Sequence, residues 1–181
     1  MINADLFALS LMGRRCPQCY MKESATQFIK QLTHPVKGKL FLLFKLPSAF
    51  FSGVRIRSVT EEQCVVTVPY KWFSQNPFRS TYFACLAMAA EMTTGVLGLM
   101  QISGRKPAVS MLVVSIEGNF FKKATDVTNF VCEDGKAFER LVDEAIATGE
   151  AKTIKAKSIG RNNAGEIVAE FYITWSFKAK N

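Results

Sequence analysis

The stretch Ser80–Gly104, STYFACLAMAAEMTTGVLGLMQISG, decides the fold of this 181-residue chain. It is apolar on every side, and its only charge is Glu91, with Arg79 and Arg105 just outside the two ends. A helix that is hydrophobic all round belongs inside a protein core or a membrane. A buried carboxylate is costly unless it is paired, neutralised or used. We therefore expect a buried central helix on which Glu91 is the polar group that calls for a role.

The same stretch is long enough to span a bilayer. Against that reading stand Glu91, the adjacent threonines and glycines of the stretch, and the lack of any second span. We therefore expect no membrane partner, and a location in the cytoplasm.

Composition fits one domain with a sizeable core. Lys and Arg number 23 against 15 Asp and Glu, a net charge of +8, which favours anionic partners. The basic residues are spread along the chain, so no nucleic-acid partner is expected; a nucleic-acid or membrane-surface binder stays as an alternative that rests on charge alone.

The cysteine and histidine content argues against metal and triad chemistry. Five cysteines, an odd number, favour reduced thiols in a cytosolic protein. Cys16 and Cys19 form the only CxxC motif, with no second pair to complete a metal site, so no metal is predicted. His34, the only histidine, precedes a proline and is interpreted as structural.

Residues 1–21 are interpreted as a dispensable N-terminal extension, and residues 22–181 as a single domain. The basic pair Arg14-Arg15 follows the apolar start, whereas a secretory signal has the opposite order. Short helical segments over 23–32 and 37–46 end at prolines. The lysines of the second segment lie either at a membrane or simply in water: Lys37, Lys39 and Lys45.

The rest of the chain alternates with a period of two, which predicts strands over 53–70, 108–124, 126–132, 151–160 and 166–178. Gly118 predicts a bulge or a bend in the long second segment. Residues 136–148 have helical spacing. The sum is an α+β protein, a curved antiparallel sheet wrapped around a long central helix, whose edges a second copy could cover by pairing.

This pattern resembles the hotdog superfamily, and is most similar to a poorly characterised hotdog group described as thioesterases. Three segments of the sequence carry the resemblance: SGVRIRSVTEEQCVVTVPY at 52–70, NPFRSTYFACLAMAAE at 76–91, and AKSIGRNNAGEIVAEFYITWSF at 156–177. The hotdog fold is what the resemblance implies for residues 22–180.

The middle segment is the most specific of the three. Hotdog thioesterases of the phenylacetate and hydroxybenzoyl types often read Asn or Gln, then His-Gly-Gly, then Asp or Glu on the helix. Here Asn76 takes the amide position, Tyr82-Phe83-Ala84 replaces His-Gly-Gly, and Glu91 falls on the carboxylate. The chain departs from the family pattern where the histidine and both glycines are lost, and Tyr82 either donates a hydrogen bond in place of the histidine or plugs the site.

The resemblance implies hydrolysis of an acyl-CoA thioester, with Glu91 as general base or nucleophile. The N-terminus of the helix, near Phe83 and Ala84, would polarise the carbonyl. Tyr82 and Glu91 lie nine residues apart, roughly 13 Å along one helix, so one helix cannot bring both to one carbonyl. Two antiparallel helices across a dimer axis could, and a homodimer or a dimer of dimers is therefore expected.

No cofactor is expected beyond the coenzyme A of the substrate. Its phosphates suit a basic chain, and the candidates to hold them are Arg79, Arg105, Lys106, Lys122, Lys123, Lys155 and Lys157. In some related enzymes a hydroxyl lies one turn beyond the carboxylate; here that position is Gly95, with Thr94 just before it.

Two alternatives stay open. Glu91 could be structural, paired with Asn76, Thr94 or a group of a second copy. The protein could also hold an acyl chain or acyl-CoA without turning it over. The acyl group, and the choice between coenzyme A and an acyl carrier protein, are open as well.

Overall fold

The computed structural model describes residues 17–180, with side chains from residue 25 onward. Cys16 and most of the predicted N-terminal extension lie outside the described residues. The helices are α1 (Pro17–Thr33), α2 (Lys37–Lys45), α3 (Pro47–Phe51), the 3-10 helix η3 (Trp72–Ser74), α4 (Phe83–Ile102) and α5 (Gly135–Thr148). The strands are β1 (Arg55–Val59), β2 (Cys64–Val68), β3 (Val109–Phe120), β4 (Thr128–Cys132), β5 (Lys152–Arg161) and β6 (Ile167–Ala179).

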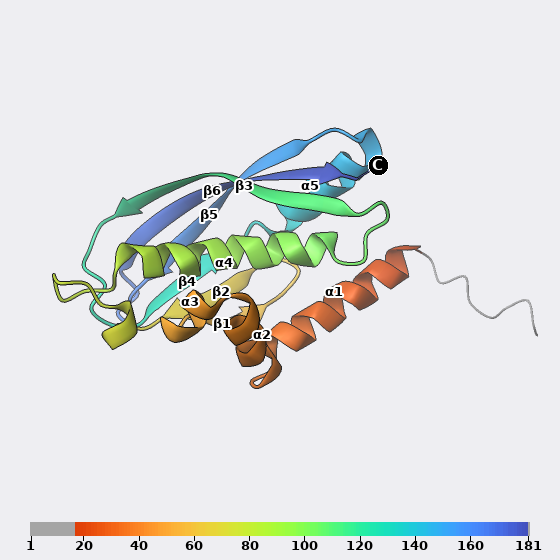
Figure 1. Cartoon of the computed structure of the whole chain (residues 1–181). Coiled ribbons are helices and arrows are strands. Elements are labelled where there is room, and N and C mark those ends of the chain that lie inside the picture. Colours follow the sequence, from red (N-terminus) through yellow and green to blue (C-terminus); the bar gives the residue numbers. More distant parts are fainter. Residues whose placement is uncertain (1–16, 181) are drawn as a thin grey trace, which may run out of the picture.

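The described strands form one antiparallel sheet in the order β1-β2-β4-β5-β6-β3. The sheet curves around α4, which runs along its inner face, while α1, α2 and α3 lie on the β1 side (Figure 1). β1 and β3 are therefore the two free edges. The α+β class and the strand-and-helix pattern expected from the sequence are confirmed.

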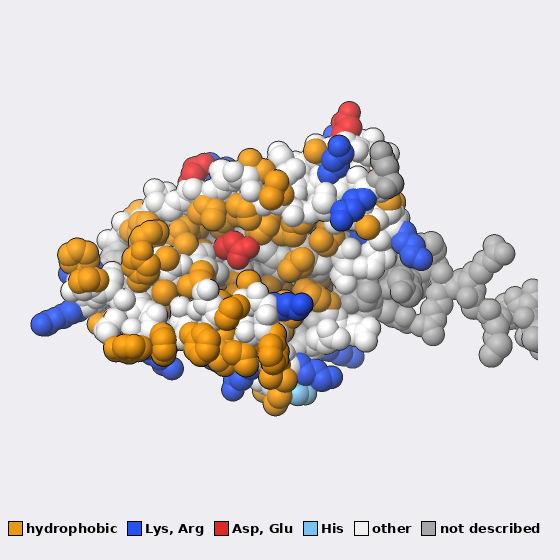
Figure 2. Space-filling model, viewed as in Figure 1, with side chains coloured by type: hydrophobic (Ala, Val, Ile, Leu, Met, Phe, Trp, Pro, Cys, Tyr) orange, Lys and Arg blue, Asp and Glu red, His pale blue; other side chains and the backbone are white. Residues whose placement is uncertain are grey.

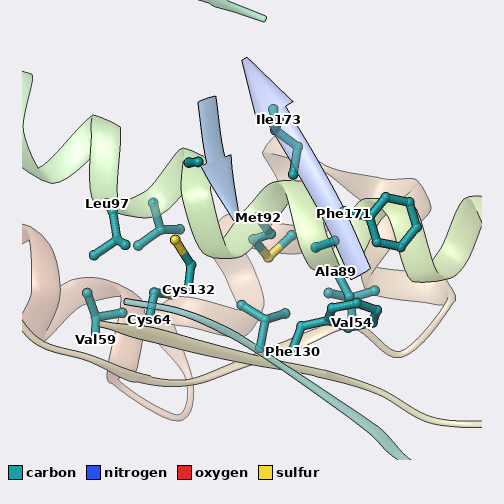
Figure 3. Packing of buried hydrophobic residues seen from close by; sticks show 14 of the residues in the cluster. Val54, Val59, Cys64, Ala89, Met92, Leu97, Phe130, Cys132, Phe171 and Ile173 are labelled. Carbon is teal, nitrogen blue, oxygen red and sulfur yellow. The ribbon is translucent and has the colours of Figure 1, made fainter. Parts of the chain in front are cut away.

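The core forms between α4 and the inner face of the sheet. Ala89, Met92 and Leu97 of α4 pack against side chains from β4 and β6, as Figure 3 shows for Phe130 and Ile173. In β6 the inward residues are buried and their neighbours only half-buried, as period-two alternation requires. α5 packs on α4, β5 and β6, where the buried Phe138 ring meets Phe177 edge-on at 5.9 Å between centroids.

α4 is the only helix of the described chain that is long and apolar enough to cross a bilayer, and 67% of its most apolar window is buried inside the protein. Its apolar character is explained by packing beneath the sheet. α4 is the buried core helix of the fold, as expected.

β3 departs from the sequence expectation in one detail. Its bulge lies between Val113 and Ser115, and not at Gly118. Gly118 pairs with Phe171, and a Cβ on Gly118 would lie 2.8 Å from the Phe171 ring. The glycine thus makes room for an aromatic ring, which a sequence pattern cannot distinguish from a bulge.

Candidate functional site at the start and middle of helix α4

The N-terminus of α4 is fixed by backbone bonds from two distant segments. Thr81 N donates to Ala124 O at 2.7 Å, and Tyr82 N donates to Ser74 O at 2.7 Å. Tyr82, the N-cap residue, makes no side-chain capping bond. Within the described chain, no acceptor meets the amides of Phe83 and Ala84. Two N–H groups at the positive end of the helix are therefore left for a ligand.

Asn76 organises the loop that leads into this helix. Its Oδ1 accepts hydrogen bonds from Phe78 N at 2.9 Å, Ser80 N at 3.2 Å and Ser80 Oγ at 3.2 Å. Arg79, at the tip of the turn, has a left-handed backbone with a φ of 58°. The carbonyl end of the Asn76 amide is thus occupied by the loop, and only Nδ2, 3.5 Å from Thr81 O, is loosely held.

An open hollow of about 570 Å³ lies beside the helix start. Loop 76–82, the first turns of α4 and the end of β3 enclose it, and its lining includes Asn76, Thr81, Tyr82, Phe83, Phe120, Lys122 and Lys123. The rings of Tyr82 and Phe83 meet edge-on, 4.8 Å between centroids. The hollow therefore combines aromatic walls, two lysines and the open amides of the helix.

Two features of the hollow favour a polar or anionic ligand group. Thr81 is buried, and its Oγ1 has no hydrogen-bond partner in the described structure. Lys122 is paired with Glu166, whereas Lys123 makes no ion pair among the described residues.

Glu91 lies two turns further along α4, on the side that the sheet leaves half open. Burial raises the pKa of its carboxyl group, because the charged form loses water. No described residue donates a hydrogen bond to this carboxylate or forms an ion pair with it. The group is thus half-buried, partly desolvated and without a hydrogen-bond or ion-pair partner among the described residues.

Gly95 makes the space into which the carboxylate folds. A Cβ on Gly95 would lie 3.0 Å from Glu91 Oε1 and 3.4 Å from Cζ2 of Trp175. The carboxylate and the indole therefore flank the same point, one turn beyond Glu91. The resemblance predicted a hydroxyl at this position in some relatives, and here the absent side chain lets the carboxylate lie back against the helix.

Thr94 holds the Trp175 indole in place beside Gly95. Its hydroxyl donates to Glu91 O at 2.9 Å and accepts from Trp175 Nε1 at 2.9 Å. These two bonds orient the indole beside Gly95. Thr94, the hydroxyl residue that the resemblance puts next to the carboxylate as a candidate substrate-binding group, thus positions Trp175, and its hydroxyl is already engaged in the single chain.

The remaining predicted residues are spread widely. Arg105 lies beyond the C-terminus of α4, where its guanidinium is held by Asp143 and by Gln101 O at 3.0 Å. Lys106 follows it at the same end and is exposed. Glu91 does not line the hollow that contains Tyr82, so one chain does not bring the two together.

The sequence pattern did not connect Trp175 with Glu91. The only available signal was its inward position on the last strand, which does not show which helix residue it meets. Thr81 was likewise not singled out as a site residue. In the described residues no group of three or more His, Cys, Asp or Glu side chains could hold a metal ion.

The half-open side of α4 continues into β3. The face viewed in Figure 2 carries hydrophobic side chains over α4 and the adjoining strand, with acidic atoms in their middle. On β3 the exposed Ile116 pairs with the inward Ile173 and so lies on the α4 side, whereas the exposed Leu112 pairs with Ser176 on the other face of the sheet. An apolar face that surrounds a desolvated carboxylate and runs to a free sheet edge is incomplete as a surface in water.

Comparison with known proteins gives structural likeness only. No family model matches the chain, and no curated protein is similar to it in sequence. A Pseudomonas aeruginosa protein of unknown function, named as a probable thioesterase, superposes with a TM-score of 0.69 at 19% identity, over 83% of this chain and 99% of that one.

Two further solved structures extend the likeness. A Chlorobaculum tepidum protein of unknown function has a TM-score of 0.69 at 15% identity, over 89% of this chain and 98% of its own. A Haemophilus influenzae thioesterase has a TM-score of 0.56 at 13% identity, over 77% of this chain and 88% of its own. These likenesses show the fold: the chain has the hotdog fold that its sequence resembles.

Proposed function

We propose that the protein is a thioesterase that hydrolyses an acyl-CoA, with Glu91 as the catalytic carboxylate. The observation that carries the proposal is the state of Glu91: half-buried with a raised pKa, unpaired among the described residues, and held beside Gly95 and Trp175. A desolvation penalty that nothing in the chain offsets is typical of a group kept for chemistry. The likeness to structures named as thioesterases supports the same reaction class.

The reaction needs a base and an oxyanion site. Glu91 accepts a proton from water, and the hydroxide adds to the thioester carbonyl. The open amides of Phe83 and Ala84 stabilise the oxyanion. The carbon–sulfur bond then breaks, the sulfur leaves as a thiol with the proton from Glu91, and a carboxylic acid is released. Direct attack by the Glu91 carboxylate is the variant of this step, with water cleaving the resulting anhydride.

A homodimer brings the two halves of this site together. β3, a strand of 12 residues, pairs only with β6, so its outer edge has free backbone donors and acceptors, and its exposed side chains include the apolar Leu112, Val114 and Ile116. Such an edge is a template for pairing. Pairing through β3 lays the half-open side of one α4 against that of a second copy, and places the amides of one helix near Glu91 of the other.

The hollow beside the helix start suits the coenzyme A part of the substrate. Lys123, which makes no ion pair among the described residues, offers positive charge for phosphates, with Lys122 and its partner Glu166 beside it, and the exposed Phe83 ring offers an apolar wall. The described cysteines are free and buried, which fits the proposed location in a reducing cytoplasm: Cys64, Cys85 and Cys132.

The alternative is a protein that binds an acyl-CoA without cleaving it. It is favoured by one observation: the segment Tyr82-Phe83-Ala84 puts exposed aromatic rings where the related enzymes have His-Gly-Gly. Both functions use the same site, and turnover distinguishes them.

The test is free-thiol release from acyl-CoAs of short, long and aromatic acyl groups, by the native chain and by Glu91→Gln. Gln keeps the shape and removes the charge, so activity should fall about 10²–10⁴-fold, the usual contribution of a general base. Glu61→Gln, in the exposed turn between β1 and β2, is the matched control and should keep full activity. Tight binding with no thiol release from any substrate would establish the binding function in place of the enzyme.

A further inference from the structure

A second apolar surface lies on the other side of α4 from β3. We call it the aromatic ridge, and its exposed members come from α2, α3, η3 and the turns around them: Val36, Leu40, Phe44, Leu46, Phe51, Trp72 and Phe73. Phe44 is 74% exposed and Trp72 is 75% exposed. In Figure 2 hydrophobic side chains form a row along the lower edge of the molecule, over α2 and α3, with basic side chains next to them.

The ridge is one continuous surface built from separate elements. The Phe51 ring of α3 lies 5.9 Å from the Phe73 ring of η3, and Phe73 lies 4.8 Å from Trp72, both between centroids. Val36, the N-cap residue of α2, and Leu40 and Phe44 of the helix recur every four residues, which places them on one face. The opposite face of α2 already supplies the core through the buried Leu42. The chain therefore turns apolar side chains outward here without using them in its own core.

The charge around the ridge has one sign. Residues 24–60 contain no Asp or Glu, and their basic residues are Lys30, Lys37, Lys39, Lys45, Arg55 and Arg57. The lysines that border the ridge are exposed, and within the described chain none of them forms an ion pair: Lys37, Lys39, Lys45 and Lys71. Free cations beside exposed Trp, Phe and Leu are the composition that binds an anionic lipid surface.

The ridge is remote from the edge that the proposed dimer uses. α3 runs through Gly53 directly into β1, with Val54 N donating to Ala49 O at 2.9 Å. β1 and β3 are opposite edges of the sheet. Pairing of two copies through β3 therefore leaves the ridge of each copy at an outer end of the joined sheet, free to meet another surface.

We propose that the aromatic ridge docks this protein on an anionic phospholipid bilayer, with the aromatic side chains at the headgroup level and the lysines on lipid phosphates. This goes beyond the proposed hydrolysis and does not depend on it. It departs from the expectation of no membrane partner and takes up the membrane-surface alternative, which rested on charge alone. Among the described elements none crosses the bilayer: α4 stays in the core, and only the ridge enters the interface.

The test is co-sedimentation of the full chain with vesicles of phosphatidylcholine alone and of phosphatidylcholine with a minority of phosphatidylglycerol. The native chain should sediment with the anionic vesicles, and raised salt should release it. Lys39→Glu/Lys45→Glu should weaken binding about tenfold or more, since each basic residue near the surface contributes. The matched control, Lys136→Glu/Lys178→Glu, makes the same charge change at exposed positions away from the ridge and should bind like the native chain.

Phe44→Ser/Trp72→Ser tests the apolar part without touching the core. Both side chains are exposed, so the variant should keep the native circular dichroism spectrum and lose most vesicle binding. Equal binding by this variant and the native chain, or equal loss in the two charge variants, would overturn the proposal. The absence of vesicle binding by the native chain would also overturn it. If Phe44→Ser/Trp72→Ser then changes the oligomeric state in gel filtration, a second copy is the occupant of the ridge.

Discussion

At the scale of single residues, the environment of Glu91 is set by a missing side chain. Gly95 leaves the space that the carboxylate occupies, and Thr94 holds the indole of Trp175 beside it. Position and desolvation of the carboxylate are therefore properties of three neighbours. Each can be changed without removing Glu91 itself.

Gly95→Ala should separate activity from stability. Its methyl group would lie 3.0 Å from Glu91 Oε1, so the flexible carboxylate moves, and thiol release should fall at least about tenfold. Alanine is the better helix former by about 1 kcal/mol, so the free energy of unfolding should hold or rise. Enzyme assays and urea denaturation check the two parts.

Gly98→Ala is the contrasting variant. There the methyl group would lie 2.5 Å from Met111 Cε and 3.0 Å from Phe177 Cζ, inside the core. Overpacking should lower the free energy of unfolding by about 1–3 kcal/mol. A Gly95→Ala protein that loses as much stability as Gly98→Ala would show that the space beside Glu91 is ordinary core packing.

The raised pKa of Glu91 predicts a pH dependence of stability. The folded chain binds this proton more tightly than the unfolded chain does, because burial penalises the charged form. The stability of the native chain relative to Glu91→Gln should therefore be greatest at acid pH and fall as pH rises through the raised pKa. Urea denaturation of both proteins at several pH values measures the difference.

The same raised pKa of Glu91 should appear in catalysis. A general base works only when deprotonated, so kcat/KM should rise with pH along a limb displaced above the ordinary range of a glutamate. That limb should be missing from the residual activity of Glu91→Gln. If the free energy of unfolding of the native chain relative to Glu91→Gln rises with pH, or does not change with pH, the Glu91 carboxylate is not desolvated in solution.

At the scale of elements, α4 and β3 form the two parts of the surface around Glu91. α4 supplies a buried face to the core and a half-open face with Glu91, and β3 supplies an apolar edge beside it. The length and burial of α4 could be predicted from its apolar sequence. The exposure of β3 could not, because its residues have the same alternation as the other strands, and only the strand order makes β3 an edge.

Leu112→Lys/Val114→Lys should convert a dimer to a monomer. Both native side chains are exposed on β3, and paired copies would bring the new positive charges together at the joined edge. Light scattering after gel filtration should show the monomer mass, and thiol release should fall with it if each site needs both copies.

The matched control for these charges is Thr153→Lys, at an exposed position of β5. Thr153 pairs with Ser176 of β6 and lies away from the β3 edge, so the lysine there should leave mass and activity unchanged. A Leu112→Lys/Val114→Lys protein that stays dimeric would place the interface elsewhere.

At the scale of the whole molecule, one hotdog domain presents two apolar surfaces on opposite sides of α4. The β3 side surrounds Glu91, and the aromatic ridge stands on the β1 side. In our proposals the first surface pairs two copies and the second meets lipid. On these proposals the single chain would be one half of an assembly with an outward-facing ridge at each end.

Removal of residues 1–20 should leave the domain intact. The described side chains of α1 that pack on the core are Ala25, Phe28, Ile29 and Leu32, all beyond that point. The midpoint of thermal unfolding should therefore shift by no more than about 2 °C, well under the shift expected for a loss of 1 kcal/mol. A shorter chain that starts at residue 34 also loses the buried Leu32 and should unfold at a clearly lower temperature.

The sequence by itself determined the class, the central helix, the strand pattern and the one carboxylate on an apolar helix. These follow from local periodicity and composition, which each segment carries alone. The resemblance to hotdog proteins then predicted the curved sheet around the helix, and the structure confirms it.

Only the tertiary structure decided how the site is built. The hydrogen bond between Thr94 and Trp175 joins residues 81 positions apart. Arg105 forms an ion pair with Asp143, and the Asn76 side chain accepts hydrogen bonds from its own loop. Which long-range partners meet depends on how strands and helices pack, since no local pattern encodes a contact between segments far apart in the chain. For the same physical reason the aromatic ridge became visible only when packing showed which of its aromatic side chains the core leaves in water.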